Sequence, residues 1–288
     1  MLGTELSLLM EKSGVKFTGT DREVDITNVS ALEKKAEELQ ITWIVNCAAY
    51  TAVDRAEDDI ETCRKLNVTG VANTALCAKN AGANFIHIST DYVFDGKGIA
   101  EGDGLRPYRE DDETNPIGVY GLSKRDGEIA VMENGPHFFI IRTAWLYGKY
   151  GGNFVNTMLR LMNEKDEVKV VDDQQGSPTW AFDLASLILT LIKTVDSGKK
   201  TPFGIYHFTN EGKLSWFDFA KEIYRQGREL GLIKKDCNVK PCASGEYPAK
   251  VKRPAYSVLD KGKIKAALDI DIPTWDESLK KFLQICAY

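Results

Sequence analysis

Apolar runs of strand length alternate with segments of helical spacing through the first half of the chain. Three runs, at residues 41–46, 84–90 and 138–147, have the near-continuous hydrophobicity of strands buried on both faces of a parallel sheet. Between the first two, residues 57–81 carry apolar positions at the intervals of an amphipathic helix. This alternation predicts an α/β fold with a doubly wound parallel sheet.

The second half of the chain, beyond about residue 148, has a less regular spacing. Its pattern predicts helices at 153–163 and 182–194 and strands at 168–173 and 205–209. No repeat or low-complexity linker divides the chain. We therefore expect the second half to form a smaller α/β lobe that packs on the first.

The charge balance excludes some classes of partner. The 288 residues include 37 lysines and arginines against 42 acidic residues, a net charge of −5, which gives no strong attraction to nucleic acid or to an anionic membrane. No stretch approaches a membrane span, and the N-terminus lacks the pattern of a signal peptide. We expect a cytoplasmic protein with neither nucleic acid nor a membrane as partner.

The cysteines and histidines are scattered along the chain. The six cysteines have no zinc-like spacing and several fall in apolar segments, so buried free thiols are expected and a metal site is not. The three histidines, at positions 87, 137 and 207, lie on or beside apolar strands. Their placement indicates a structural role.

Candidate chemistry gathers between residues 84 and 124. The strand at 84–90 ends in Ser89 and Thr90, and ligands bind at the carboxyl ends of parallel strands. Tyr120 and Lys124 stand four residues apart and would share one helix face. A nearby ammonium lowers the pKa of a tyrosine, so Tyr120 could pass a proton to a carbonyl oxygen as a hydride reaches its carbon. The Thr90 hydroxyl could hold that oxygen.

Tyrosine and lysine at this spacing are common on solvated helix faces, so the pair alone is weak evidence. Together, segments 89–96 and 120–124 resemble the extended short-chain dehydrogenase/reductase superfamily, and within it the dTDP-4-dehydrorhamnose reductases. The resemblance also includes residues 46–54, 141–148, 153–158, 170–179 and 252–254. Because it runs nearly end to end, it is far more specific than any one motif.

The resemblance implies a Rossmann-type, dinucleotide-binding domain at 1–147, completed by part of 181–200, and a mainly substrate-binding lobe at 148–288. Members of the superfamily begin with a strand and a glycine-rich turn, whereas this sequence opens directly on a helical pattern. Gly3 matches the last glycine of that turn. The first strand is missing from the sequence, and we expect truncation of the reading frame to be the reason.

The resemblance implies NADPH or NADH as cofactor. Asp21 follows a predicted short strand, where an acid bonds the adenosine ribose, although a solvated loop acid has the same pattern. Arg22 comes next and could receive a 2′-phosphate, so the choice between the two cofactors stays open. The implied cofactor-binding residues are Gly3, Asp21, Asp25, Ile26, Ala48, Ala49, Tyr50, Asn67, Tyr120 and Lys124.

A nucleotide-linked sugar is the implied substrate. Trp145 would offer an apolar ring face to a deoxysugar, with a core tryptophan as the alternative. Arg253 lies in a small basic loop, which is either solvated or closes over the substrate and binds a phosphate. The implied substrate-binding residues are Thr90, Asp91, Trp145, Asn153 and Arg253.

The expected activity is reduction of the C4 ketone of dTDP-4-dehydro-L-rhamnose to dTDP-L-rhamnose for polysaccharide synthesis, with Tyr120 as proton donor and Lys124 and Thr90 as its catalytic partners. Two alternatives remain: another nucleotide-sugar reductase or epimerase, and a non-catalytic regulatory subunit like that of methionine adenosyltransferase. Tyr92, where dehydratases add a second acid, argues for simple reduction. The presence of Thr90, Tyr120 and Lys124 together argues against a non-catalytic subunit, which has no need for these three side chains.

Some members of the family form homodimers through a divalent ion held by glutamates. Glu5 matches one such ligand, but Phe182 stands where another is expected. We therefore predict no metal and leave a homodimer open.

Overall fold

The computed structural model describes residues 1–135, 137–246 and 249–287. At its centre lies a four-stranded sheet in the order β1 (Trp43–Asn46), β2 (Asn84–Thr90), β5 (Phe138–Thr143) and β10 (Gly204–His207). All neighbouring strands are parallel, so their carboxyl ends meet at one edge of the sheet.

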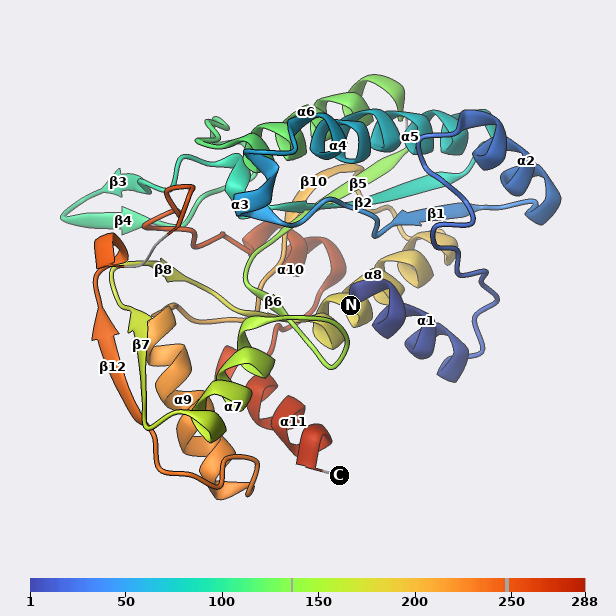
Figure 1. Cartoon of the computed structure of the whole chain (residues 1–288). Helices are drawn as coiled ribbons and strands as arrows, with labels where there is room; N and C mark the ends of the chain where they lie inside the picture. Colours follow the sequence, from blue (N-terminus) through green and yellow to red (C-terminus); the bar gives the residue numbers. More distant parts are fainter. Residues whose placement is uncertain (136, 247–248, 288) are drawn as a thin grey trace.

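Helices cover both faces of this sheet (Figure 1). One face carries α2 (Val29–Leu39), α5 (Val71–Asn80) and α6 (Val119–Asn134). The other carries α1 (Leu2–Lys12), α8 (Ala181–Asp196) and α10 (Gly262–Leu268). The prediction of a doubly wound α/β fold is confirmed. The chain returns to the central sheet after it has entered the second lobe, since β10, α8 and α10 all belong to this layer.

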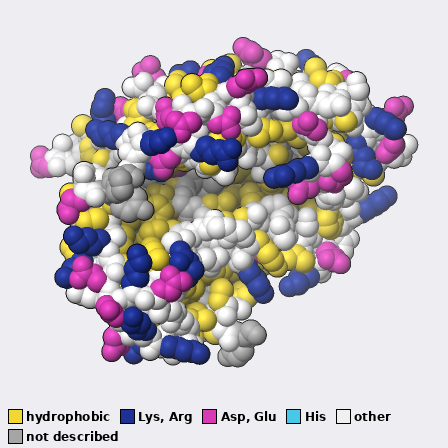
Figure 2. All heavy atoms as spheres, viewed as in Figure 1, with side chains coloured by type: hydrophobic (Ala, Val, Ile, Leu, Met, Phe, Trp, Pro, Cys, Tyr) yellow, Lys and Arg dark blue, Asp and Glu magenta, His cyan; other side chains and the backbone are white. Residues whose placement is uncertain are grey.

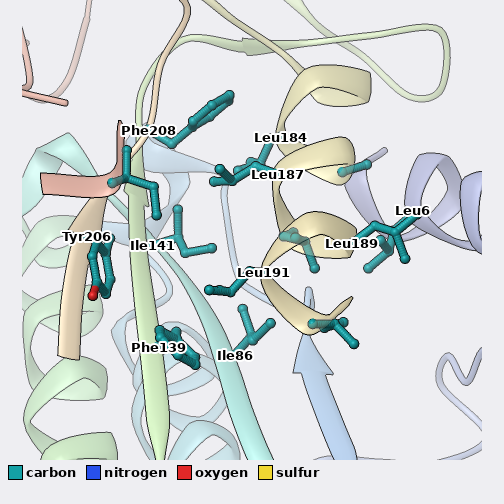
Figure 3. Packing of buried hydrophobic residues seen from close by; sticks show 14 of the residues in the cluster. Leu6, Ile86, Phe139, Ile141, Leu184, Leu187, Leu189, Leu191, Tyr206 and Phe208 are labelled. Atoms are coloured by element: carbon teal, nitrogen blue, oxygen red, sulfur yellow. The ribbon is translucent and has the colours of Figure 1, made fainter. Parts of the chain in front are cut away.

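The larger core lies between the sheet and α8 (Figure 3). Leu184, Leu187 and Leu191 of α8 pack with Ile86 of β2 and with β5, while α1 packs against α8 from outside. α8 is apolar on most of its surface because strands cover one side and α1 another. Full burial of a leucine contributes about 1.5–3 kcal/mol, so α8 holds this half of the molecule together.

The second lobe pairs β7 (Glu167–Val171) with β12 (Asn238–Cys242) and packs them against helices. These helices are α7 (Phe154–Glu164), α9 (Trp216–Glu229) and α11 (Trp275–Ala287). Its core is rich in aromatic side chains, which bury much apolar area each; they include Tyr147, Phe154, Trp216, Phe219 and Phe282. As the sequence predicts, the Ser215 hydroxyl caps α9 by accepting from the Asp218 N–H at 3.1 Å.

Short pairs of strands join the lobe to the carboxyl edge of the sheet, and a hairpin projects beside them. The bounds of these strands are β6 (Leu146–Tyr147) with β9 (Thr179–Trp180), β8 (Gln175–Gly176) with β11 (Leu214–Ser215), and β3 (Ile99–Glu101) with β4 (Gly104–Arg106). The remaining described turns of helix are α3 (Val53–Ala56), α4 (Ile60–Arg64), a π-helical segment (Lys65–Gly70) and two 3₁₀ turns (Asp91–Val93 and Ser244–Glu246).

One prediction about local structure is wrong, and another is confirmed with an irregularity that the pattern did not indicate. Residues 15–21 form no strand in the described chain. β1 is an edge strand whose neighbour in the sheet is β2, so no described strand pairs with residues 15–21. The predicted helix at 57–81 is present from Ile60 to Asn80, although it widens to a π-helix over Lys65–Gly70. At Gly70 an added Cβ would lie 2.6 Å from the side chain of Ile26, so the turn at 25–28 packs directly against this interruption.

No helix in the described ranges combines the length and the hydrophobicity that crossing a membrane requires.

Candidate active site

The close approach of α6 to the end of β2 defines the candidate site. β2 ends at Thr90 and runs into the 3₁₀ turn Asp91–Val93. At Gly121 of α6, an added Cβ would lie only 2.3 Å from the Tyr92 carbonyl oxygen. Glycine is therefore required for α6 to bring Tyr120 beside Thr90.

We expect Gly121→Ala to destabilise the chain by about 1–3 kcal/mol, because the new methyl group would push α6 away from the 3₁₀ turn. Urea unfolding measures this free energy. Gly104→Ala is the matched control, since a Cβ there meets nothing within 4 Å. Equal stability of the two variants would contradict the packing argument.

Thr90 connects two side chains of the candidate site. Its hydroxyl donates to Asp91 Oδ1 at 2.9 Å and accepts from the Tyr92 N–H at 3.2 Å, and its proximity to the Tyr120 phenol opposes the rise of that phenol's pKa. Thr90, Asp91 and Tyr120 are 6%, 3% and 9% exposed. The predicted proton donor and the predicted carbonyl-orienting hydroxyl therefore contact each other.

Lys124 lies one turn after Tyr120 on α6, and its ammonium points back to β2. Its Nζ donates to the Ile88 carbonyl oxygen at 2.7 Å and lies 3.3 Å from Nε2 of His87. Burial lowers the pKa of Lys124 to about 8 and lowers the pKa of His87 well below its usual value. Sequence reasoning placed His87 among structural residues and missed this contact. Strand alternation was the available signal, because His87 and Ser89 share one face of β2 and Ser89 bonds to α6 through Glu128.

The expected acidification of Tyr120 by Lys124 is wrong for this arrangement. Burial raises the pKa of the Tyr120 phenol above its usual value; the Thr90 hydrogen bond opposes this, whereas the negative charge of Asp91 adds to it. The hydrogen bonds that Lys124 makes in the described chain go to β2 instead. The phenol is thus protonated at neutral pH, which is the state that a proton donor needs.

The loop after β1 lies beside this helix and contains the small residues Ala48 and Ala49. Asn46 Oδ1 accepts from the Ala48 N–H at 3.0 Å. Asn67 accepts from the Tyr50 N–H at 2.8 Å, and its amide nitrogen donates to the Tyr50 carbonyl oxygen at 3.0 Å. The same nitrogen donates to Ser123 Oγ of α6 at 3.0 Å, so Asn67 holds the loop against the helix.

The start of α1 adjoins the same loop. An added Cβ at Gly3 would lie 3.7 Å from Cβ of Cys47. This region combines small side chains, a backbone held by Asn46 and Asn67, and the nearby Lys124 amine. Such a set of groups fits the ribose and nicotinamide of a dinucleotide. The structure thus brings Gly3, Ala48, Ala49, Tyr50, Asn67 and Lys124 into one region.

The predicted adenine-side residues lie further along the same edge. Asp25 Oδ1 accepts from the N–H and the hydroxyl of Thr27, both at 2.8 Å, and so stabilises its own turn. Ile26 packs on Gly70, and its carbonyl oxygen accepts from Asn73 Nδ2 at 3.1 Å. Asp21 is exposed in the loop that precedes this turn.

Trp145 stands at the sheet edge in a left-handed conformation, with a φ of 48°. Its ring stacks on Trp216 with centroids 3.6 Å apart and covers Gly176, where an added Cβ would lie 2.6 Å from the ring. Ser257 Oγ lies 2.8 Å from the same Cβ position and donates to the Gln175 carbonyl oxygen at 3.5 Å. Ser257 therefore lies on a C-terminal segment close to Gly176 and the Trp145 ring, and it is a residue that sequence reasoning missed and that no motif indicated.

Two predicted substrate ligands already have protein partners. Asn153 caps α7: its Oδ1 accepts from the Asn156 N–H at 3.0 Å and its Nδ2 donates to the Gly148 carbonyl oxygen at 2.7 Å. Arg253 pairs with Asp54 at 2.5 Å and donates to the Tyr92 hydroxyl at 3.3 Å. Neither side chain reaches the candidate site without giving up these bonds.

The segment around Arg253 bridges the two parts of the molecule. Lys250 pairs with Asp58, next to α3, and the Val251 N–H donates to Asp54 Oδ1 at 3.4 Å. Figure 2 shows a hollow between the upper layer and the lower lobe, with hydrophobic side chains inside it and Lys or Arg side chains near its rims. A hollow of this character can take up a ligand with apolar and anionic parts.

The chain matches the family described as RmlD substrate binding domain over residues 1–287. It is 41% identical to a dTDP-4-dehydrorhamnose reductase of Streptomyces griseus over 290 residues, which covers 99% of this chain and 91% of the relative. The chain belongs to the dTDP-4-dehydrorhamnose reductase family. Its Tyr120–Lys124 helix and the loop at 46–50 are the parts of the family resemblance that meet in the candidate site.

Solved structures of this reductase family share the whole fold. The crystal structure of the Clostridium acetobutylicum reductase superposes with a TM-score of 0.89 at 40% identity and covers 100% of this chain and 96% of that one. The reductase of Bacillus anthracis, solved in complex with NADP, has a TM-score of 0.89 at 38% identity. The match covers 99% of this chain and 95% of that one. The superfamily assignment made from the sequence is confirmed.

Proposed function

We propose that the chain reduces the C4 ketone of dTDP-4-dehydro-L-rhamnose to the alcohol, giving dTDP-L-rhamnose, with NADPH or NADH as reductant. The names of its relatives and the NADP bound to one of them support this activity. The single observation that carries the proposal is the buried pair of Tyr120 and Thr90, which lie side by side at the end of β2, with Lys124 one turn away on α6.

Each of these side chains has a proposed task. Bound NADPH or NADH supplies a hydride to the carbonyl carbon. Tyr120 donates the proton that the carbonyl oxygen needs, and Thr90 positions that oxygen. Lys124 and the Ala48–Tyr50 loop bind the nicotinamide ribose, while Gly3, Asp21, Asp25, Ile26 and Asn67 complete the cofactor site.

The proposed sugar contacts are Asp91 and the exposed part of the Trp145 ring, whose apolar face suits a deoxysugar. Asn153 is proposed to contact the substrate through the start of α7. Arg253 binds a substrate phosphate by exchanging its bond to Asp54 for a charge-assisted bond to the ligand. This exchange would release the 250–254 segment as the substrate enters.

The organisation around the site is also a proposal. Residues 1–147 with part of 181–200 form the cofactor domain, and residues 148–288 contribute mainly the substrate lobe. The six free cysteines fit a reducing compartment, which supports the cytoplasm. A homodimer is the proposed assembly to test by light scattering.

Oxidation of NADPH or NADH in the presence of the 4-keto sugar tests the function. We expect one cofactor oxidised for each sugar reduced, and no oxidation with dTDP-glucose, which lacks the ketone. No oxidation of either cofactor with the 4-keto sugar would overturn the proposal. Binding of cofactor without turnover would favour a regulatory subunit instead.

A further inference from the structure

A line of buried polar groups connects the loop after β1 to Lys124. Asn46 and His87 are register partners on β1 and β2, and Asn46 Nδ2 lies 3.3 Å from His87 Nδ1. On the other side of the ring, His87 Nε2 lies 3.3 Å from Lys124 Nζ. Asn46, His87 and Lys124 are 4%, 0% and 2% exposed, so their polar atoms depend on one another for hydrogen bonds.

The direction of these hydrogen bonds is set at the Asn46 end. The backbone N–H of Ala48 can only donate, and it donates to Asn46 Oδ1 at 3.0 Å. The other end of the amide, which faces His87, is therefore the NH₂ group, and it also only donates. Burial keeps His87 neutral, because it lowers the pKa of the imidazole well below its usual value. His87 Nδ1 must accept from Asn46, so the single ring proton is on Nε2.

The Nε2–H of His87 faces Lys124 Nζ. An ammonium has three N–H groups and no lone pair, so two buried donors would oppose each other at 3.3 Å, which is costly. A neutral amine accepts from Nε2–H with its lone pair, donates one N–H to the Ile88 carbonyl oxygen at 2.7 Å, and keeps a second N–H for a ligand. Turning the Asn46 amide over only moves the conflict to the Ala48 N–H.

Building on the proposed function, we propose that His87 is a positioning residue, which is oriented by Asn46, donates its Nε2 proton to Lys124 and thereby selects the neutral amine as the form that binds the nicotinamide ribose. The second N–H of the amine then donates to a ribose hydroxyl.

A neutral amine suits a reduction. An ammonium beside the ribose would oppose the positive charge that the nicotinamide ring gains as it gives up hydride. A neutral Lys124 also adds no charge that would lower the pKa of Tyr120, which burial raises. The phenol therefore keeps its proton until the ketone oxygen takes it.

The charged and titratable groups around Lys124 are consistent with the amine. Burial lowers the pKa of Lys124 to about 8, against the opposing influence of Glu128 and Cys63. The Glu128 carboxylate is already paired with Arg142 through bonds of 2.9 and 2.7 Å. Burial raises the pKa of the Cys63 thiol, which is thus protonated and uncharged. The proton on His87 Nε2 disfavours the ammonium further, so Lys124 should titrate below about pH 8.

The position of the His87 proton in the wild-type chain tests the proposal without cofactor, substrate or turnover. Long-range ¹H–¹⁵N NMR correlation distinguishes a protonated ring nitrogen from an unprotonated one, and at neutral pH we expect the His87 proton on Nε2. His207 is an internal control of the opposite kind. Its Nδ1 lies 3.1 Å from the Tyr108 carbonyl oxygen, which only accepts, so its proton should be on Nδ1. A His87 proton on Nδ1 would overturn the proposal.

Asn46→Asp should reverse the line at its start. A carboxylate of the same shape still accepts from the Ala48 N–H and now also accepts from His87. The His87 proton should therefore move to Nδ1, and Nε2 should accept from a Lys124 ammonium. Asn115→Asp, the same substitution at an exposed position, is the control and should leave that proton on Nε2. If the proton stays on Nε2 in folded Asn46→Asp, the proposal fails.

Titration of Lys124, followed by its ¹³Cε resonance, is the second measurement. We expect a midpoint below about pH 8 in the wild type. His87→Gln should raise the midpoint by about one pH unit or more, because the glutamine oxygen can accept from an ammonium. His207→Gln, the same substitution at another buried histidine, should titrate as wild type. A wild-type midpoint near the usual value of about 10.4 would overturn the proposal.

Steady-state kinetics connect the network to the reaction. With the 4-keto sugar and NADPH, wild-type kcat should fall as the pH drops through the Lys124 midpoint, because the ammonium replaces the amine. In His87→Gln this fall should begin at a higher pH. A wild-type kcat that rises as Lys124 is protonated would overturn the role of the amine. No oxidation of NADPH at any pH would overturn the proposed function instead, and the NMR measurements would still decide the direction of the hydrogen bonds.

Discussion

Tyr120→Phe should reduce kcat for the 4-keto sugar by about 10²–10⁴-fold and leave KM nearly unchanged. The variant removes only the phenolic oxygen, which is the proposed proton donor, and general acid catalysis by a positioned side chain contributes in this range. The ring remains packed edge-on against Tyr92, with centroids 5.4 Å apart, so the fold should persist. Steady-state oxidation of NADPH at several sugar concentrations separates kcat from KM.

Tyr147→Phe is the matched control for this substitution. Its hydroxyl is buried without a hydrogen-bond partner in the described chain, so the loss of that oxygen should leave activity intact and stability unchanged or slightly higher. A Tyr120→Phe variant with more than a tenth of wild-type kcat would mean that the proton comes from elsewhere. Cofactor binding by Tyr120→Phe, measured by fluorescence titration, shows whether the site remains assembled.

Arg142→Met should lower the free energy of unfolding by about 3–5 kcal/mol, the range for breaking a buried ion pair on one side. The Arg142 guanidinium donates to Glu128 Oε1 at 2.9 Å and to Oε2 at 2.7 Å. The two side chains are only 3% and 2% exposed, and Ser89 donates to the same carboxylate. This bidentate bond ties α6 to β2 and β5, so its loss should also reduce activity.

Two further variants separate charge from packing in this prediction. Arg225→Met breaks an exposed pair with Glu222 at 2.5 Å, and its expected cost is at most about 1 kcal/mol. The double variant Arg142→Met/Glu128→Leu replaces both buried charges and should recover much of the lost stability. Urea unfolding of all four proteins measures these differences. A loss below about 1 kcal/mol for Arg142→Met would contradict the buried-pair argument.

Strand and helix positions near the site could be predicted because their patterns are local. Buried strands need continuous apolar runs and helices need a three- to four-residue repeat, so β2, β5 and α6 lie where the sequence indicates them. Residues 15–21 had the composition of a strand, but a strand exists only when another strand pairs with it. Similarly, the π-helical interruption at Lys65–Gly70 depends on the packing of Ile26 against Gly70, which no local pattern reveals.

The functional predictions divide in the same way. The end of β2 and the four-residue spacing brought Thr90, Tyr120 and Lys124 to one place, as expected from sheet and helix periodicity. The partners of Lys124, however, are His87 and the Ile88 carbonyl oxygen. Arg253 meets Asp54 from a distant segment, and this ion pair could not be foreseen from a basic loop.

The sequence by itself determined the family, the α/β class and the residues that carry the proposed chemistry, because periodicity and motifs are properties of neighbouring positions. Only the tertiary structure decided the protonation states of the side chains in the site. Burial raises the pKa of Tyr120 and of Asp91, and the Thr90 hydroxyl donates to Asp91. These effects arise because distant segments exclude solvent from the site and offer hydrogen bonds to it. The local pattern of residues does not reveal either contribution.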